Sequence, residues 1–389
     1  MRDDRLRVGV LFGGRSGEHE ISLRSASTIM RALDAARYDI VPIGITPDGR
    51  WWAGSELYEL VEAHQRTLRP LVPCGREVTL VAEPSRRALI ALDGSSASVP
   101  LDVVFPVLHG PFGEDGTVQG LLELADIPYV GAGVLASAVG MDKGAMKTAF
   151  RDAGLPLCRW IVAWPRHEPA EAIAARVNAA IGFPCFVKPA NLGSSLGITK
   201  VHEPEGLDAA LREAASWDPK VLVEEAVLAR ELECGVIGNE APEASVVGEL
   251  VPSHEFYDYA DKYVEDGAGL LVPAPLPTPI ADTVRELALQ AFRAIDCAGL
   301  ARVDFFLDRQ SERVLVNEIN TMPGFTAASM FPRLWEASGF PLSRLLDRLI
   351  ALALARHAAR KSRRTSVRSA SAPERRPEAS AAPAGDPSA

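Results

Sequence analysis

The feature that most constrains the fold is a stretch near the C-terminus, residues 300–329, reading LARVDFFLDRQSERVLVNEINTMPGFTAAS. Two apolar runs, residues 300–307 and 314–319, flank a polar turn at 308–313. This pattern predicts a hairpin of two half-buried strands. Because side chains alternate between the two faces of a strand, the polar residues inside the runs should share one face.

Four polar residues meet when these strands pair. Arg302 and Asp304 share a face of the first strand, and Glu318 and Asn320 share a face of the second. Two carboxylates and an amide oxygen are costly to gather inside a fold unless a cation coordinates them. Such oxygen ligands suit Mg²⁺ or Mn²⁺. An ordinary hairpin with exposed polar residues is the alternative, but Glu318 and Asn320 interrupt an otherwise apolar strand.

A sharp turn, Thr321-Met322-Pro323-Gly324, follows the second strand and can direct backbone N–H groups at an anion. By itself, the hairpin and turn predict a metal and phosphate site without specifying the reaction.

Composition excludes several classes of protein. A chain of 389 residues should hold two or three domains, and 47% hydrophobic with 24% charged residues is typical of a soluble globular protein. The net charge of −10 disfavours non-specific nucleic-acid binding. Neither a signal-peptide core nor an apolar run of transmembrane length is found, so we expect no membrane association and a cytoplasmic location.

The cysteines are far apart in sequence and include no CxxC pair, which indicates neither a zinc ribbon nor a disulfide framework. Free thiols in a reducing cytosol are expected. The cysteines are Cys74, Cys158, Cys185, Cys234 and Cys297.

The first domain, residues 1–135, opens with a strand at 6–12, a glycine turn, a helix at 22–33 and a strand at 39–45. This order predicts a parallel α/β sheet. The turn lacks the GxGxxG dinucleotide pattern but carries Glu18. His109 follows another buried strand, so both residues should line one crevice beyond the carboxyl ends of the strands.

The middle of the chain carries features that suit a polyphosphate. Lys143 opens a helix, and Lys188 ends a strand at 183–188. The next loop, 189–197, has two glycines and two serines, which suits a phosphate cover, although it is not a Walker A motif. Glu224 and Glu231, at and beyond the end of a later strand, can accept hydrogen bonds from an adenine amine and ribose hydroxyls.

Three further segments complete the chain. Residues 256–271 are polar and poorly periodic, which predicts a mobile loop over a site. Residues 343–357 have the apolar spacing of an amphipathic helix. Residues 358–389 have almost no large apolar side chain and are expected to be a disordered tail.

Seven motifs resemble those of the D-alanine–D-alanine ligases of the ATP-grasp superfamily, and they follow the order of that family over residues 5–355. They are FGGRSGEHEIS, HGPFGEDGTVQG, MDKGAMK, VKPANLGSSLG, EFYDYADKY, RVDFFL and NEINTMPGFT.

The resemblance implies a fold of class α/β and α+β in three domains. An N-terminal α/β domain (1–135) should hold the first D-alanine, and a central ATP-grasp lobe (136–250) should carry the phosphate loop. A C-terminal lobe (251–357) should contribute the mobile loop, the hairpin and the final helix. The two lobes should enclose ATP.

The resemblance also implies a reaction. ATP phosphorylates the carboxylate of one D-alanine, and the amine of a second D-alanine attacks the acyl phosphate. A tetrahedral intermediate then expels phosphate, which yields a dipeptide for peptidoglycan synthesis.

Residue roles follow from the motif positions. Asp304, Glu318 and Asn320 are expected to bind two Mg²⁺ (or Mn²⁺) ions. The residues expected to contact ATP are Lys143, Lys188, Ser194, Ser195, Glu224, Glu231, Lys262 and Asn317.

The substrate side is assigned in the same way. Glu18 should hold the ammonium of the first D-alanine, with His109 near its carboxylate. Arg302 and the Gly324 N–H should stabilise the oxyanion, and Ser329 should bind the carboxylate of the second D-alanine. A further implied feature is a hydrogen-bonded triad that ties the loop shut, formed by Glu18, Ser194 and Tyr263.

Two alternatives remain open. A D-alanine–D-lactate ligase of the same family would share the fold, although the stretch FYDYADKY resembles the dipeptide-forming type. A nucleotide-binding protein without catalysis is the second alternative. We also expect a homodimer.

Overall fold

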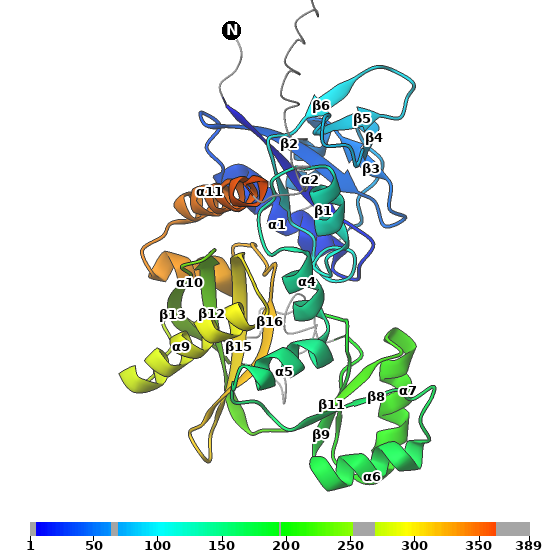
Figure 1. The fold of residues 1–389 in the computed structure, drawn as a ribbon, viewed down its shortest axis with the longest axis vertical. Coiled ribbons are helices and arrows are strands. Elements are labelled where there is room, and N and C mark those ends of the chain that lie inside the picture. Colours follow the sequence, from blue (N-terminus) through cyan, green and yellow to red (C-terminus); the bar gives the residue numbers. More distant parts are fainter. Residues whose placement is uncertain (1–4, 64–68, 194–195, 252–268, 363–389) are drawn as a thin grey trace, which may run out of the picture.

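The computed structural model describes residues 5–63, 69–193, 196–251 and 269–362. Its strands form three sheets of seven, four and five strands, each with its own helices (Figure 1). The predicted fold class, an α/β domain followed by two α+β lobes, is confirmed. Among the described helices, none combines the length and apolar character needed to cross a membrane.

The seven-stranded sheet of the first domain has the order β6-β5-β4-β3-β2-β1-β7. Its strands are β1 (Leu6–Gly13), β2 (Tyr38–Ile45), β3 (Trp51–Ala53), β4 (Arg76–Leu80), β5 (Ala88–Ala91), β6 (Ser98–Pro100) and β7 (Val103–Pro106). Only β2-β1-β7 is parallel, whereas β3 to β6 pair antiparallel. The predicted parallel sheet is therefore correct only for its core, because most of the remaining connections are too short for a crossover.

Three helices accompany this sheet: α1 (His19–Ala32), α2 (Glu56–Ala63) and α3 (Thr117–Leu124). Helix α1 follows β1 through the glycine turn, and its buried face includes Leu23, Ala26 and Ile29. This short connection leaves Glu18 at the N-cap position of α1, beyond the carboxyl end of β1.

The four-stranded sheet belongs to the central lobe and is antiparallel, in the order β10-β9-β11-β8. Its elements are β8 (Trp160–Ala163), α6 (Ala170–Ala180), β9 (Cys185–Pro189), β10 (Thr199–Val201), η2 (Pro204–Gly206), α7 (Leu207–Trp217) and β11 (Val221–Glu225). Helices α6 and α7 bury apolar side chains against this sheet, including Ile173 and Leu211.

The five-stranded sheet has the order β14-β13-β12-β15-β16. Its strands are β12 (Ala229–Gly238), β13 (Glu243–Val251), β14 (Gly269–Leu271), β15 (Gly299–Asp308) and β16 (Val314–Asn320). The predicted boundary at residue 250 is wrong, because β12 and β13 pair with the hairpin strand β15 and not with the central sheet. Residues 269–271, predicted to be loop, pair with the edge of β13.

Helices cover both faces of the five-stranded sheet. Helices α4 (Val134–Met141), α5 (Lys143–Asp152) and α9 (Thr278–Ala294) share a core with it that includes Met146 and Phe292. Helix α10 (Met330–Ala337) lies on the opposite face, where Gly235 leaves room for the Trp335 ring; a Cβ at Gly235 would lie 2.7 Å from Trp335 Nε1.

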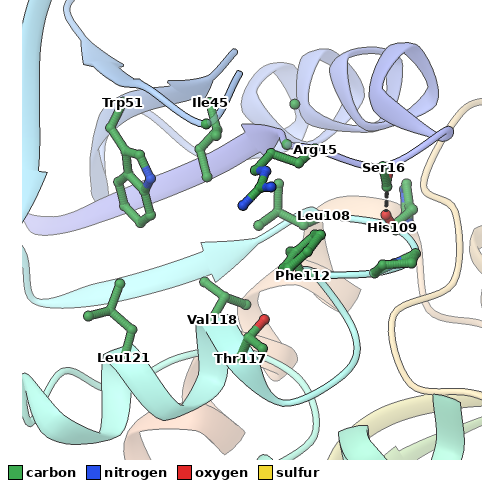
Figure 2. Close-up of a pocket in the computed structure, with 15 residues that line it drawn as sticks. Arg15, Ser16, Ile45, Trp51, Leu108, His109, Phe112, Thr117, Val118 and Leu121 are labelled. Atoms are coloured by element: carbon green, nitrogen blue, oxygen red, sulfur yellow. Dashed lines mark hydrogen bonds between the residues drawn. The ribbon is translucent and has the colours of Figure 1, made fainter. Parts of the chain in front are cut away.

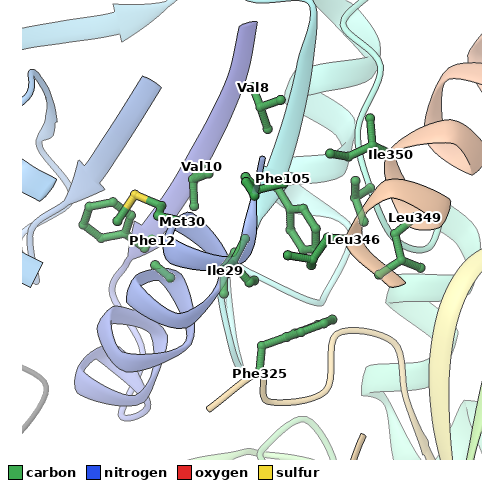
Figure 3. Packing of buried hydrophobic residues seen from close by; sticks show 14 of the residues in the cluster. Val8, Val10, Phe12, Ile29, Met30, Phe105, Phe325, Leu346, Leu349 and Ile350 are labelled. Atoms are coloured by element: carbon green, nitrogen blue, oxygen red, sulfur yellow. The ribbon is translucent and has the colours of Figure 1, made fainter. Parts of the chain in front are cut away.

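The final helix, α11 (Leu342–Lys361), packs on the first domain (Figure 1). Leu346, Leu349 and Ile350 join the core around Phe105 of β7 (Figure 3). Residues 358–361 were predicted to be tail, but they are helical. This prediction failed because Arg360 and Lys361 pair with Glu123 and Asp126 of the first domain, an arrangement that the sequence pattern does not reveal.

Candidate active site

A cavity of about 700 Å³ lies where elements of all three sheets approach one another. The predicted site residues that line it are Glu18, His109, Lys143, Lys188, Glu224, Glu231, Arg302, Asp304, Asn317, Glu318, Asn320, Gly324 and Ser329. The other predicted site residues, Ser194, Ser195, Lys262 and Tyr263, lie outside the described residues. Residues that are up to 311 positions apart in sequence, Glu18 and Ser329, therefore face one cavity (329 minus 18).

The hairpin pairs as its sequence pattern predicts. Arg302 is opposite Asn320, and Asp304 is opposite Glu318. Burial alternates along β15, with Ala301, Val303 and other odd-numbered residues in the core. The polar residues are therefore on the face that lines the cavity.

Arg302 connects several acidic groups on this face. Its guanidinium donates two hydrogen bonds of 2.7 Å to Asp304, and Nε lies 3.1 Å from Glu233 Oε2. Although desolvation opposes the charged form, Asp304 and Glu233 raise the pKa of Arg302 well above its ordinary value. Glu233 was not assigned a role from sequence, since its position on β12 becomes apparent only once β12 pairs with β15.

The donor set at the hairpin fits a hard divalent cation. Asp304, Glu318 and Asn320 present two carboxylates and an amide on adjacent strands, and Asn320 Nδ2 donates to Asp304 Oδ2 at 3.0 Å. A rotation of the Asn320 amide would present its oxygen instead. Within the described ranges, no group of three or more His, Cys, Asp or Glu side chains is placed to hold a metal ion. A metal at the hairpin would thus need the amide and further oxygens, such as those of phosphate.

The opposite wall carries a buried cationic cluster. Glu224 of β11 is 1% exposed and pairs with Lys188 of β9, whose Nζ is 2.7 Å from Oε2. Lys147 of α5, which is also 1% exposed, pairs with the other oxygen of Glu224. Although burial acts in the opposite direction, these lysines lower the pKa of Glu224 to about 2.

Lys147 was missed by the sequence interpretation, although it lies one helical turn after Lys143 in the motif MDKGAMK. Its Nζ also donates to the Asn317 carbonyl oxygen at 3.1 Å, which ties the cluster to β16. The i, i+4 spacing was the available signal, because it places both lysines on one helix face.

Lys143 lies between the loop that follows β9 and the hairpin. Its Nζ donates to the Leu192 carbonyl oxygen at 2.6 Å and lies 3.9 Å from Glu318 Oε2. Asp142 sets the start of α5, because its side chain accepts a hydrogen bond from the Ala145 N–H at 2.9 Å. Lys143 thereby brings a positive charge beside the acidic hairpin.

Glu18 enters the cavity through space that two glycines leave open. A Cβ at Gly193 would lie 2.8 Å from Glu18 Oε2, and one at Gly110 would lie 2.9 Å from the same oxygen. Gly110 also has a φ of +72°, which favours glycine. These two loops therefore accommodate a carboxylate that is suitable for receiving an ammonium group.

His109 is 5% exposed and both ring nitrogens have protein partners. Nδ1 is 3.0 Å from the Met322 carbonyl oxygen, which can only accept, so Nδ1 carries the proton. Burial lowers the pKa of His109, so the ring is neutral and Nε2 accepts from the Ser25 hydroxyl at 3.2 Å. Its predicted contact with a substrate carboxylate remains a prediction, and these contacts favour a positioning role instead.

Glu114 was not assigned a role from sequence. Its Oε1 accepts the Gly110 N–H at 2.7 Å, and Oε2 accepts the Met322 N–H at 3.3 Å. Desolvation and the negative charge of Glu18 raise the pKa of Glu114 to about 8. The motif HGPFGEDG contains two acidic residues, and sequence alone does not show which one turns inward.

Gly324 and Ser329 lie together, as their predicted roles require. A Cβ at Gly324 would be 2.8 Å from Ser329 Oγ. Ser329 is the N-cap residue of α10, where free backbone N–H groups favour an anion such as a carboxylate. Its hydroxyl accepts the Thr326 N–H at 3.0 Å.

A second cavity, of about 250 Å³, lies behind the first-domain loops (Figure 2). It is lined by Arg15, Trp51 and Phe112 among others. Ser16 Oγ donates to the His109 carbonyl oxygen at 2.6 Å and joins two of the loops that line this cavity (Figure 2).

Comparison with known proteins places these features in a family. The family model described as "D-ala D-ala ligase N-terminus" matches residues 7–132, and the one described as "D-ala D-ala ligase C-terminus" matches residues 149–351. A D-alanine–D-alanine ligase of Thermoanaerobacter sp. (strain X514) is 50% identical over 357 residues, covering 91% of this chain and 98% of the relative. One from Heliobacterium modesticaldum is 49% identical over 353 residues, covering 90% of this chain and 95% of the relative.

Solved structures agree with these matches. The D-alanine-D-alanine ligase of Coxiella burnetii superposes with a TM-score of 0.80 at 37% identity, covering 92% of this chain and 96% of that one. The VanG D-Ala:D-Ser ligase of Enterococcus faecalis gives a TM-score of 0.80 at 35% identity, covering 90% and 99%. The two family models together span most of the chain, and the cavity residues come from both matched regions. The chain therefore belongs to the D-alanine–D-alanine ligase family.

Proposed function

We propose that this protein joins two D-alanines with ATP, through an acyl phosphate, and releases ADP and phosphate. The observation that carries the proposal is the single cavity in which a cationic wall faces an acidic hairpin, in a chain with 50% identity to named D-alanine–D-alanine ligases. We infer that the product serves peptidoglycan synthesis in the cytoplasm and that the enzyme is a homodimer.

ATP lies between the central and C-terminal lobes in this proposal. Lys143 and Lys188 neutralise its phosphates, and Glu231 accepts from the ribose, while Asn317 lies near the phosphates and Glu224 near the adenine amine. The burial of Glu224 between two lysines supports a second role for it, which is to hold Lys188 in place. Ser194, Ser195 and Lys262 complete the phosphate contacts.

Asp304, Glu318 and Asn320 would hold two Mg²⁺ or Mn²⁺ ions. When bound, these ions neutralise the charge on the phosphates and orient them for in-line transfer. Arg302 keeps the Asp304 carboxylate oriented toward the cavity, because it binds both carboxylate oxygens.

The first D-alanine binds with its ammonium at Glu18, and its carboxylate attacks the γ-phosphate of ATP. The second D-alanine binds with its carboxylate at Ser329 and the N-terminus of α10. Its amine attacks the acyl carbonyl, and the oxyanion of the tetrahedral intermediate receives hydrogen bonds from Arg302 and the Gly324 N–H. Collapse of this intermediate breaks the bond to phosphate and leaves the amide.

Water must be excluded because acyl phosphates hydrolyse readily. We assign closure to the triad of Glu18, Ser194 and Tyr263, of which only Glu18 lies among the described residues. The D-lactate alternative depends on the same loop around Tyr263, and the named relatives support the dipeptide.

The test is product analysis with purified full-length protein, ATP, Mg²⁺ and D-alanine. We expect one D-alanyl-D-alanine for each ADP. Adding D-lactate at pH 6 to 9 should not divert the product to the depsipeptide. A protein that binds ATP but forms no dipeptide would instead support the non-catalytic alternative.

A further inference from the structure

The turn that carries Gly324, residues 321–325, is held by first-domain side chains. Met322 follows β16 of the C-terminal lobe, yet both of its backbone groups have first-domain partners: Glu114 accepts from its N–H and His109 donates to its carbonyl oxygen. Ser25 of α1 accepts the Phe325 N–H at 3.2 Å.

These bonds form a directed chain. The Phe325 N–H donates to Ser25 Oγ, and the Ser25 hydroxyl donates to His109 Nε2. The opposite ring nitrogen, Nδ1, donates to the Met322 carbonyl oxygen. Each donor has one acceptor, so the chain fixes the backbone on both sides of Gly324 in one arrangement.

Packing reinforces the chain. Phe325 is fully buried in the core that joins β7 and α11 (Figure 3). Its ring meets that of Phe105 edge-on, with centroids 5.7 Å apart. Gly324 itself is only half-buried, so its N–H can reach the cavity while its neighbours are anchored.

We propose that Glu114, together with His109 and Ser25, is a positioning residue of the first domain that sets the Gly324 N–H against the tetrahedral carbonyl. The inference rests on the proposed function, since it requires a ligation with an oxyanion at Gly324. Glu114 also contacts the loop of Gly110, which borders Glu18. One carboxyl group therefore joins the 321–325 turn to the loop beside Glu18, where the first D-alanine is proposed to bind.

The variant Glu114→Gln tests this coupling. Each oxygen of Glu114 can accept a backbone N–H, including the hydroxyl oxygen of the protonated carboxyl. Glutamine offers one acceptor oxygen to the two backbone N–H groups and directs its own NH₂ at the other, so the turn loses one anchor. We expect kcat to fall at least about 10-fold, which is less than the roughly 100- to 1,000-fold loss on removing an oxyanion donor, because the Gly324 N–H is displaced and not removed; the KM for ATP should change less than about 2-fold.

Asp115→Asn is the matched control. Asp115 stands beside Glu114 and accepts the Phe112 and Thr117 N–H groups, so it braces the same loop without contacting the 321–325 turn. Its kcat should stay within about 2-fold of the wild-type value.

A binding measurement separates positioning from general damage. A phosphinate analogue of the dipeptide mimics the tetrahedral oxyanion, so its affinity in the presence of ADP and Mg²⁺ should fall by about the same factor as kcat in Glu114→Gln. The affinity for ADP should not change. If Glu114→Gln does not fold, Ser25→Ala, which removes the acceptor of the Phe325 N–H, should show the same pattern.

The outcomes distinguish this inference from the proposed function. Absence of dipeptide from the wild-type protein would overturn the proposed function and with it this inference. An active wild-type protein whose Glu114→Gln and Asp115→Asn variants behave alike, in kcat and in phosphinate affinity, would overturn the positioning inference alone.

Discussion

Of the two charged walls of the large cavity, one carries an excess of carboxylates and the other an excess of lysines. At the hairpin, Arg302 faces Asp304, Glu233 and Glu318, so carboxylates outnumber the cation among these residues. On the central lobe, Glu224 faces two lysines, so cations are in excess.

This difference shows how a fold can be prepared for two partners of opposite charge. Buried charges are expensive unless they are paired, so each wall compensates part of its own charge with an internal partner. The remaining excess is negative at the hairpin, where it suits divalent ions, and positive at Lys188, where it suits phosphates. A metal–nucleotide complex satisfies both walls at once.

The largest expected effect comes from breaking the cationic wall. Glu224→Gln leaves Lys147 and Lys188 buried around a neutral amide, which should cost about 3–5 kcal/mol of unfolding free energy. Urea unfolding measures it. Glu225→Gln is the control, because Glu225 pairs with the exposed Arg159, and a loss of at most about 1 kcal/mol is expected. Similar losses in both variants would contradict the special position of Glu224.

Breaking the acidic wall should affect activity more than stability. Glu318→Gln replaces a carboxylate that we propose as a metal ligand with an amide, and turnover should fall at least ~100-fold at saturating Mg²⁺. Steady-state kinetics measure this effect. Glu312→Gln changes an exposed carboxylate in the turn of the same hairpin and should leave turnover unchanged. Near-normal turnover in Glu318→Gln would refute the metal assignment.

The pH dependence of stability sharpens the comparison, because folding lowers the pKa of Glu224 and raises the pKa of Glu114. The two carboxyl groups should therefore change the unfolding free energy with pH in opposite directions. The folded-state pKa of Glu224, about 2, lies below its ordinary value of 4.5. Its contribution is present above pH 4.5 and is lost as the pH falls toward 2. The pKa of Glu114 is raised from 4.5 to about 8. Its contribution is present below pH 4.5 and is lost as the pH rises toward 8.

Unfolding free energies measured from pH 3 to 9 test these signs. In Glu224→Gln, the unfolding free energy should rise less between pH 3 and 4.5 than it does in the wild-type protein. In Glu114→Gln, it should decline less between pH 4.5 and 8. Profiles that run parallel to the wild-type curve would show that neither carboxyl titrates as stated.

The smallest effect is expected at a balanced pair. Lys220 Nζ lies 2.6 Å from Asp142 Oδ1, near the cationic wall, and both side chains are partly exposed. Asp142→Asn keeps a good N-cap residue and loses one ion pair, so unfolding should become easier by at most about 1 kcal/mol. Urea unfolding of this variant beside Glu224→Gln tests whether burial and imbalance, rather than pairing itself, make the Glu224 cluster important.

Several site residues could be predicted because their signals are local. The alternation along residues 300–307 predicted the polar face of β15, which lines the cavity, and the pairing of Asp304 with Glu318 followed from the hairpin. Lys188 and His109 were found because each ends or follows a buried strand. The family motifs then gave each position a role.

Other residues could not be found in this way. Glu114 and Ser25 are ordinary in their local sequence, whereas Lys147 was signalled only by its i, i+4 spacing from Lys143. All three residues acquire partners only when distant elements meet. The strand β12 was missed because its first half, ARELE, is mostly polar, and the boundary at 250 failed with it.

The sequence alone determined the chemical groups of the site: a hairpin with two carboxylates and an amide, lysines at the ends of elements, and a glycine turn beside them. These features are fixed by the alternation of side chains and by turn geometry within a few residues. Tertiary structure alone decided how the charges are balanced and what holds the Gly324 turn. The reason is that desolvation and hydrogen bonding depend on which groups lie across an interface, and here Glu114 and Met322 are 208 residues apart.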